Sequence, residues 1–371
     1  MTLRPSPPAR IGAVAALALA IALVSAGCTA TPAAPPSSST PKPTTSTISP
    51  TAAHAAAYVV GHLKDGDHVE GKFGADLGQT SDVALGLAAT GGQPAALTKV
   101  LAYLEGHGAG YVHGDPSTGE KVGAHYAGPT GKLALMAQIA GKNPASFAGL
   151  DLTAEVRALM DSKGRFRDDS KFGDFSNPLG QAFDILALQR GTADGAPQVA
   201  IDYLLTAQCK DGGFAETFPK AGAKCDSSPD ATGLALQALV AVGAGCPAVQ
   251  ARTWLMANQQ PDGSFVSSAV DPSKPAAAVS GDKPANVNST AYAALGLVAG
   301  GQSTSKIVSY LSSVQNLDGG LAVSPGSSDK ASNVYASAQA LDAFAGSSFL
   351  TAGPSPIKAA ALVCAQATTG T

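Results

Sequence analysis

Apolar residues recur along most of this chain at the spacing of a helix. Leu234, Leu236 and Leu239 are one example, and long stretches that alternate apolar and polar residues are absent. The pattern therefore predicts helices and little sheet. Many of the apolar stretches are rich in Ala and Gly, which would let neighbouring helices approach closely.

The helical pattern is organised as a repeat of about 50 residues. Three segments align without gaps, and each contains Gln, two variable residues, Asp, Gly, a small residue and an apolar one. They are residues 203–214, 254–265 and 310–321, and weaker copies occupy 58–73, 103–111 and 156–166. Because Asp followed by Gly favours a tight turn, we interpret the Asp as a turn residue. We expect the Gln to bond neighbouring backbone.

Each unit continues, after a polar loop, into a second helix of small residues. One such helix hairpin cannot bury its own apolar face, whereas six in a ring can, with the small-residue helices inside. The starts of these inner helices would then meet at one end of the ring and offer free N–H groups there. The polar residues that we place at these starts are Asp82, Thr130, Gln181, Asp230, Asn288 and Asn333.

These six residues have two interpretations. They are helix caps and nothing more, or they form a polar ligand site. For the second interpretation we take Asp82, Thr130, Asp230, Asn288 and Asn333 as candidate ligand-binding residues.

The N-terminal region has the pattern of an export signal. Two arginines precede an apolar run over residues 11–24, which is short for a bilayer span and suited to a signal peptide. The run ends at Ser25-Ala-Gly-Cys28, which resembles a bacterial lipobox with Ser in place of the usual Leu. We expect residues 1–28 to be a lipoprotein signal peptide and Cys28 to be lipidated. The alternative is an ordinary signal peptide cut nearby.

Residues 29–50 are Ser, Thr, Pro and Ala apart from Lys42 and Ile48. Such a segment has little to bury and is expected to be a disordered tether. The ring is then expected over residues 51–366, with a short tail at 367–371. This organisation predicts an exported protein, anchored by lipid at the outer face of the cell membrane.

Composition narrows the set of partners. Only 14% of the residues are charged, the net charge is −3, and no basic cluster occurs, so a nucleic-acid partner is not expected. Four cysteines besides Cys28 predict two disulfides in an exported chain. Of the three pairings we favour Cys209–Cys225, closing one loop, and Cys246–Cys364, tying the last helix to the middle of the fold. The alternative is a zinc or catalytic cysteine.

The Gln-x-x-Asp-Gly-Ser/Gly-Phe segments resemble the repeats of squalene cyclases and of protein prenyltransferase β-subunits. The resemblance covers roughly residues 52–364, and the vertebrate cobalamin carriers are a more distant analogy. It implies an all-α fold, an (α/α)6 toroid of six helix-hairpin repeats with a central cavity. It implies no single activity, because this fold is found in enzymes and carriers alike.

The catalytic signatures of the two enzyme families are missing. The Asp-x-Asp-Asp acid motif is absent, since Phe166 precedes Arg167-Asp168-Asp169. Aromatic residues, which stabilise carbocations, make up only 5% of the chain. All six histidines lie within residues 54–125, whereas the four cysteines lie beyond residue 200. No metal site is therefore predicted, and the sequence names no cofactor.

One polar cluster, in the second unit, departs from the repeat. Its histidines and tyrosines would suit a polysaccharide lyase, its carboxylates would suit glycoside hydrolysis, and His107, His113 and His125 would suit a divalent metal. A solvated loop is the fourth interpretation. We keep His113 and His125 as candidate ligand-binding residues. The cluster comprises Glu105, His107, Tyr111, His113, Asp115, His125 and Tyr126.

The sequence thus predicts an exported, lipid-anchored surface protein whose toroid binds a ligand or partner without catalysis. A small molecule or a glycan is the expected ligand. The alternatives are a surface polysaccharide lyase or glycoside hydrolase on the same toroid, and a divergent terpene-cyclase-like enzyme.

Overall fold

The structure is a computed structural model that describes residues 48–114, 123–220, 222–267, 284–328, 330–359 and 361–364. The expected signal peptide with Cys28, the tether up to residue 47, Asp115 and the tail at 367–371 lie outside the described residues. None of the helices within the described ranges has the length and apolar character needed to cross a bilayer.

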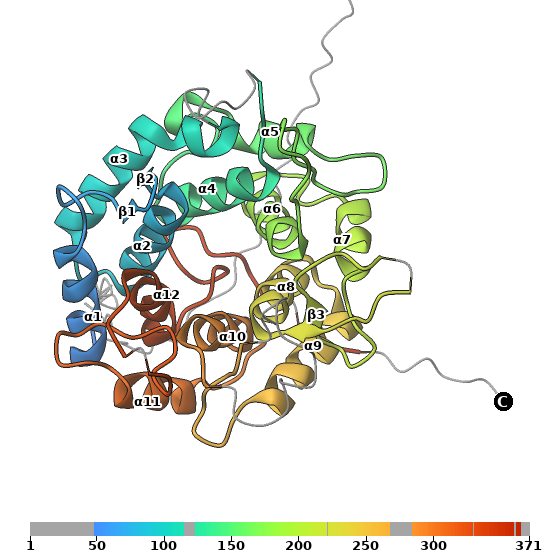
Figure 1. Cartoon of the computed structure of the whole chain (residues 1–371). Helices are drawn as coiled ribbons and strands as arrows, with labels where there is room; N and C mark the ends of the chain where they lie inside the picture. Colours follow the sequence, from blue (N-terminus) through green and yellow to red (C-terminus); the bar gives the residue numbers. More distant parts are fainter. Residues whose placement is uncertain are drawn as a thin grey trace, which may run out of the picture. The chain divides into compact units, whose positions relative to one another are not determined.

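Helices alternate along the chain between an outer and an inner ring (Figure 1). The outer helices are α1 (Pro50–Gly61), α3 (Pro94–His113), α5 (Leu152–Ala158), α7 (Gln198–Leu205), α9 (Gly245–Asn258) and α11 (Ser305–Ser313). The inner helices are α2 (Leu77–Thr90), α4 (Ala127–Ile139), α6 (Pro178–Gly191), α8 (Pro229–Val242), α10 (Val287–Ala299) and α12 (Val334–Ala345). The predicted all-α toroid, with six inner and six outer helices, is confirmed.

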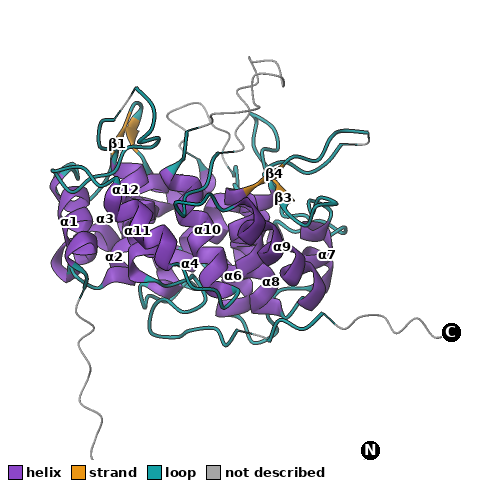
Figure 2. Cartoon of the chain, turned by 90° about the horizontal axis from the view of Figure 1, so that it is seen from below, coloured by secondary structure: helices purple, strands orange, loops and turns teal. Residues whose placement is uncertain are grey.

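Sheet is confined, among the described residues, to two antiparallel hairpins. One joins β1 (Glu70–Gly71) to β2 (Gly74–Ala75), and the other joins β3 (Phe214–Ala215) to β4 (Ser227–Ser228). Both hairpins lie on one side of the ring (Figure 2). They precede the inner helices α2 and α8, so this side is the one at which inner helices begin. We call it the mouth, and the opposite side the closed face.

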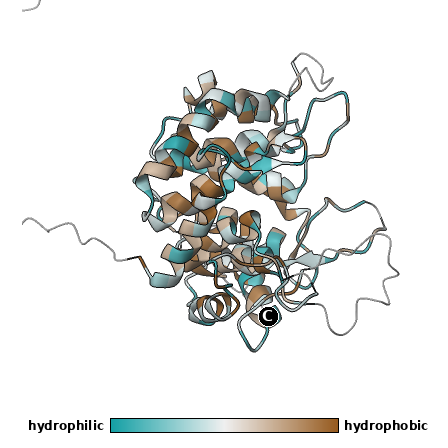
Figure 3. Cartoon of the chain, turned by 60° about the vertical axis from the view of Figure 1, so that its left-hand side comes forward, coloured by the Kyte–Doolittle hydropathy of each residue, from teal (hydrophilic) through white to brown (hydrophobic). Residues whose placement is uncertain are grey.

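The inner ring closes through direct helix contacts. Each inner helix packs against the next, and α12 packs against α2. Small residues permit the approach: a Cβ built at Gly233 of α8 would lie 2.2 Å from the backbone oxygen of Tyr292 in α10. One at Gly86 of α2 would lie 2.6 Å from the backbone oxygen of Ala338 in α12. Apolar residues fill the body of the toroid between the helices (Figure 3).

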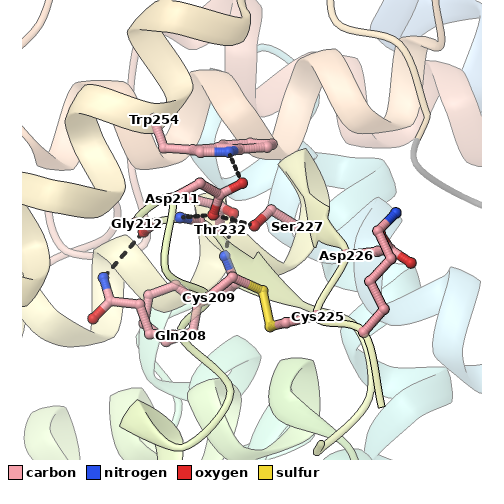
Figure 4. Close-up of a disulfide and its surroundings, with 12 residues drawn as sticks. Gln208, Cys209, Asp211, Gly212, Cys225, Asp226, Ser227, Thr232 and Trp254 are labelled. Carbon is pink, nitrogen blue, oxygen red and sulfur yellow. Dashed lines mark hydrogen bonds and ion pairs between the residues drawn. A yellow bond between two sulfur atoms is a disulfide. The ribbon is translucent and has the colours of Figure 1, made fainter. Parts of the chain in front are cut away.

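The repeat residues stabilise the turn between outer and inner helices through hydrogen bonds (Figure 4). The Asp211 carboxylate accepts hydrogen bonds from the Gly213 N–H, the Ser227 hydroxyl and the Trp254 indole. The Gln208 side chain donates to backbone oxygens of Gly212 and of Pro247 in the next outer helix.

The last repeat makes the same kinds of hydrogen bond, and one of them closes the outer ring. Gln315 donates to the backbone oxygen of Gly319 and to that of Thr51 in α1, and Asp318 accepts from the Gly320 N–H. The interpretation of the Asp residues as turn residues and of the Gln residues as backbone partners is therefore confirmed.

A second hydrogen bond recurs between each turn and its inner helix. The N–H of the apolar residue after the turn donates to a side chain one turn inside the helix. Phe214 bonds the Thr232 hydroxyl at 2.8 Å, and Phe166 bonds the Gln181 amide oxygen at 3.0 Å. The same contact joins Phe265 to Thr290, Leu321 to Ser337 and Val69 to Thr80. Among the described residues, this hydrogen bond thus joins the turn to the inner helix in five of the six units.

Three inner helices, α2, α4 and α10, begin earlier than the sequence predicted. The side chains that cap α2, α6 and α10 are Asp76, Asn177 and Asn286, so Asp82, Thr130, Gln181, Asp230 and Asn288 lie inside their helices. The predicted starts are confirmed at α6 and α8, which begin at Pro178 and Pro229, and at α12, which Asn333 caps. They were too late at α2, α4 and α10. At α2 and α10 the reason is an earlier cap residue, Asp76 or Asn286.

The chain after α12 covers the closed face. This segment is irregular from Ser347 to Cys364, and Phe349 and Leu350 are buried. Arg190 of α6 donates to the backbone oxygens of Phe349 and Ala352, and a Cβ at Gly353 would touch the backbone of α4. The ring is therefore sealed at the end where its inner helices finish.

Both predicted disulfides are present, as Cys209–Cys225 and Cys246–Cys364. The second disulfide corrects the expected position of Cys364. Cys364 lies in the irregular segment rather than on the last helix, so the bond fastens the cover of the closed face to α9.

The toroid also begins before residue 51. Ser49 caps α1 through its hydroxyl, which accepts from the Ala52 N–H, and Pro50 is the first helical residue. Ile48 packs beside Gly92, just past the end of α2. The expected boundary at residue 50 was therefore wrong, because Ile48 has an apolar side chain that the fold can bury. The chain enters the toroid at the closed face.

Candidate functional site

A buried ion pair occupies the ring beneath the mouth. Lys132 of α4 lies 2.8 Å from the Asp82 carboxylate of α2 and 3.0 Å from the backbone oxygen of Gly78. Burial alone would lower the pKa of Lys132, but the facing Asp82 carboxylate outweighs burial and the net shift is upward. Lys132 is therefore charged and holds α2 to α4.

Asn288 joins this cluster from the other side of the ring. Its amide donates to the Gln339 side-chain oxygen at 2.7 Å, and the Gln339 amide lies 3.5 Å from Asp82 and 3.4 Å from the Tyr292 hydroxyl. The hollow that remains has a volume of about 10 Å³, close to the space of one water molecule. Its lining residues are Asp82, Ala291, Tyr292, Leu295, Gln339, Asp342 and Phe349.

Several carboxyl groups around this cluster are desolvated. Burial raises the pKa of Asp230, the second residue of α8, to about 6. One of its oxygens has no hydrogen-bond partner. Burial also raises the pKa of Asp342 and of Asp184 well above the usual range. The centre of the ring therefore contains more acidic side chains than one lysine can neutralise, and some of them are held in the protonated form.

The other two predicted mouth residues have structural roles. The buried Thr130 hydroxyl donates to the Tyr126 backbone oxygen at 2.6 Å. Asn333 is exposed, and its side chain accepts from the Ala336 N–H at the start of α12. The structure thus brings Asp82 and Asn288 together through Gln339, and leaves Thr130 and Asn333 outside the cluster.

A separate cleft of about 960 Å³ lies on the mouth side between the β1–β2 hairpin, α3 and the segment before α4. Tyr103 and His107 line it and are stacked, with ring centroids 4.1 Å apart, and His68 stacks on Tyr103 from outside the lining at 4.2 Å. Tyr111 reaches from the cleft towards the ion pair, because its hydroxyl packs over Gly78. Other lining residues include Lys72, Phe73, Asp76, His113 and Tyr126.

His113 and His125 meet at one carboxylate beside this cleft. His113 Nε2 lies 2.8 Å from Glu155 Oε2, and His125 Nδ1 lies 3.8 Å from the same oxygen. Their rings are edge to face, with centroids 4.4 Å apart. His107, by contrast, bonds the Tyr103 backbone oxygen on its own helix. Of the predicted histidine cluster, the structure thus unites two members and adds Glu155.

The family comparison agrees with this architecture. The prenyltransferase alpha-alpha toroid domain matches residues 180–361, which include α7 to α12. No curated protein sequence matches the chain.

Solved structures match over most of the chain. The type II terpene cyclase MstE from Scytonema, without ligand, has a TM-score of 0.53 at 16% identity over 80% of this chain and 96% of its own. The family match and these structures together support a toroid of the terpenoid cyclase/prenyltransferase type.

Two further solved structures share this toroid. A protein from Actinoplanes has a TM-score of 0.56 at 15% identity and covers 80% of this chain and 98% of its own. A wild-type glycosidase has a TM-score of 0.53 at 16% identity and covers 82% and 97%. At these identities the likeness is one of fold alone.

Sequence reasoning missed Lys132, Gln339 and Glu155. A signal existed for Lys132, because a charged residue within an Ala- and Leu-rich inner helix has to find a partner. The same rule applies to Asp184 and Asp342, which also interrupt apolar inner helices. Glu155 had no such signal, since it lies on a short outer helix and approaches the histidines only once the ring is folded.

The raised pKa of Asp230 predicts how stability depends on pH. The folded toroid keeps a proton that the unfolded chain releases above pH 3.8, so wild type loses stability as pH rises through about 6. Asp230→Asn removes this loss. We expect the variant to gain on the order of 1–2 kcal/mol relative to wild type between about pH 4 and 7.

Urea unfolding over this pH range measures the difference. Asp194→Asn, at an exposed loop carboxyl, gives the baseline for a change of charge alone. A difference between Asp230→Asn and wild type that does not change with pH would contradict the desolvated state of Asp230.

Proposed function

We propose that this toroid is an exported, lipid-anchored binding protein that holds a glycan in the cleft on its mouth side. The observation that carries the proposal is the position of the open space. The cleft offers about 960 Å³ beside α3, whereas the hollow between the inner helices offers about 10 Å³. Of these two hollows among the described residues, only the cleft therefore has room for a ligand.

The filled centre argues against a cyclase-like activity. A chain of isoprene units needs a large apolar cavity with aromatic walls. Here the centre contains the Asp82–Lys132 ion pair and the Gln339 amide. Neither the volume nor the lining suits a hydrocarbon.

The lining of the cleft suits a sugar. An aromatic face such as the outer face of His107, which is stacked on Tyr103, can pack against the apolar C–H face of a sugar ring, while tyrosine hydroxyls and histidine nitrogens bond its hydroxyls. The stack of His68, Tyr103 and His107 holds these rings in place. Rings that are fixed before binding lose little freedom when the ligand arrives.

Binding without turnover is supported by the carboxylates of the cleft. Glycoside hydrolysis uses a pair, and the described lining includes one, Asp76. Both Asp76 oxygens are occupied at the start of α2, by the backbone and side chain of Gln79. A lyase base is equally poorly supported, because burial raises the pKa of Tyr111 and so keeps its proton on.

A second candidate function is glycan hydrolysis deeper in the mouth. Asp230, whose pKa is about 6, is suited to general acid catalysis near neutral pH, and a wild-type glycosidase shares the fold. Release of reducing sugar from a bound oligosaccharide, lost in Asp230→Asn, would favour this function over binding alone.

The proposed anchor is consistent with an accessible cleft. The chain joins the toroid at Ile48, on the closed face, so the attachment point of the tether does not obstruct the mouth. The polar composition of residues 29–47 would give the toroid freedom of reach.

Glycan binding is tested by calorimetric titration of the purified protein with neutral and acidic oligosaccharides. Tyr103→Leu should weaken binding by roughly 0.5–1.5 kcal/mol, up to about tenfold, because it removes the ring on which His107 is stacked. Tyr103→Phe should bind like wild type. Tyr203→Leu, on α7 outside the cleft, is the matched control.

Two results would overturn the binding site. One is a failure of every oligosaccharide to bind. The other is binding that survives Tyr103→Leu and disappears in Asn288→Ala, which would move the site to the centre of the mouth.

The anchor is tested by cell fractionation. Wild type should sediment with membranes and be released by detergent, whereas Cys28→Ser should appear in the medium because it lacks the lipidated sulfur. Ser25→Leu, which improves the lipobox, should remain with the membrane. A wild-type protein that is already soluble after export would show that Cys28 is not lipidated.

A further inference from the structure

Three metal-ligating side chains from separate elements converge beside the cleft. His113 is the last residue of α3, His125 precedes α4, and Glu155 lies in α5. Their ligand atoms all lie within 4.8 Å of one another. Each side chain is partly exposed, at 30%, 34% and 21%.

The backbone holds all three residues in position. His125 is paired with Asp169 in both directions, N–H to oxygen at 2.9 and 2.8 Å. The neighbouring Tyr126 N–H bonds the Val112 oxygen at 2.8 Å, which fixes the end of α3 next to the start of α4. Glu155 lies within a helix that Asp151 caps. The three side chains therefore approach one point from a rigid frame.

We propose that His113, His125 and Glu155 bind one divalent transition-metal ion of the Zn²⁺ class. Two imidazole nitrogens and one carboxylate oxygen are a ligand set that zinc accepts, at distances of about 2.0–2.2 Å, with a fourth position left for water or a ligand. An ion placed between the three groups replaces the direct His113–Glu155 hydrogen bond and needs only small rotations of the side chains.

The surroundings give the ion access and an open coordination position. His113 lines the large cleft, while His125 and Glu155 line a second hollow of about 430 Å³. Both sides of the triad are therefore reachable from solvent. The four cysteines of the described toroid are in disulfides, so no thiolate competes for the ion.

The site differs from the histidine triplet that the sequence suggested. His107 lies on α3 but bonds the Tyr103 oxygen, and Glu155 takes its place as third ligand. The proposal needs neither the lipid anchor nor the glycan, and it assigns the departure of the second unit from the repeat to metal binding.

The test is titration of the purified protein with Zn²⁺, and with Co²⁺ followed by visible absorption. Wild type should bind one ion, and Co²⁺ should show the intense bands of a tetrahedral site. His113→Ala, His125→Ala and Glu155→Gln should each weaken Zn²⁺ binding by at least about tenfold, since losses of 10–100-fold are typical even for groups outside the ligand shell. His107→Ala is the matched control and should bind like wild type.

Glu155→Gln separates metal binding from folding, because its amide oxygen can still accept from His113. Its unfolding temperature without metal should match that of wild type, and only wild type should become more stable when Zn²⁺ is added. The proposal is wrong if wild type does not bind Zn²⁺. It is also wrong if His107→Ala weakens binding as much as His113→Ala, or if Glu155→Gln binds as tightly as wild type.

Discussion

The close approach of the inner helices is the constraint on which the rest of the toroid depends. At Gly233 the neighbouring helix comes so near that a Cβ would lie 2.2 Å from the Tyr292 oxygen, and at Gly131 one would lie 2.7 Å from the Asp184 nitrogen. Six helices can close so narrow a ring only if their contact positions are small. The stripes of Ala and Gly in the second half of each repeat meet this need.

The narrow ring determines where polar chemistry can lie. Its centre has room for side chains but not for a ligand, so the charged groups that point inward must satisfy one another. Lys132 pairs with Asp82, while burial raises the pKa of Asp342 and keeps it protonated. At the other end, Arg190 bonds the segment that covers the closed face. Open space remains at the mouth, where the loops between outer and inner helices vary in length.

The second unit shows how a repeat can be adapted. Its outer helix α3 runs to His113 without the usual Asp-Gly turn, and the end of this helix lines the cleft. Tyr103, His107 and His113 lie along this lengthened helix and face that space. The adaptation is local, because the inner helix α4 still packs against α2 and α6.

The sequence predicted the fold well because the residues that form each turn lie close together along the chain. Gln208 and Asp211 act within a few residues of themselves, so their spacing reveals the turn, and the repeat then predicts the ring. The starts of α2, α4 and α10 were missed because several polar residues lie near each start, and the sequence alone does not decide where the helix begins. Pairs such as Asn288 with Gln339, or His113 with Glu155, are far apart along the chain. No local pattern could have predicted them.

Unfolding of a matched pair of glycine variants tests the central constraint most directly. Gly233→Ala places a methyl group against α10, whereas Gly106→Ala adds one to α3 where nothing lies within 4 Å. If close helix contacts hold the ring, Gly233→Ala should lower the free energy of unfolding by at least about 1–3 kcal/mol. Gly106→Ala should raise it by about 0.5–1 kcal/mol, because Ala favours helix. A Gly233→Ala protein as stable as Gly106→Ala would contradict the account.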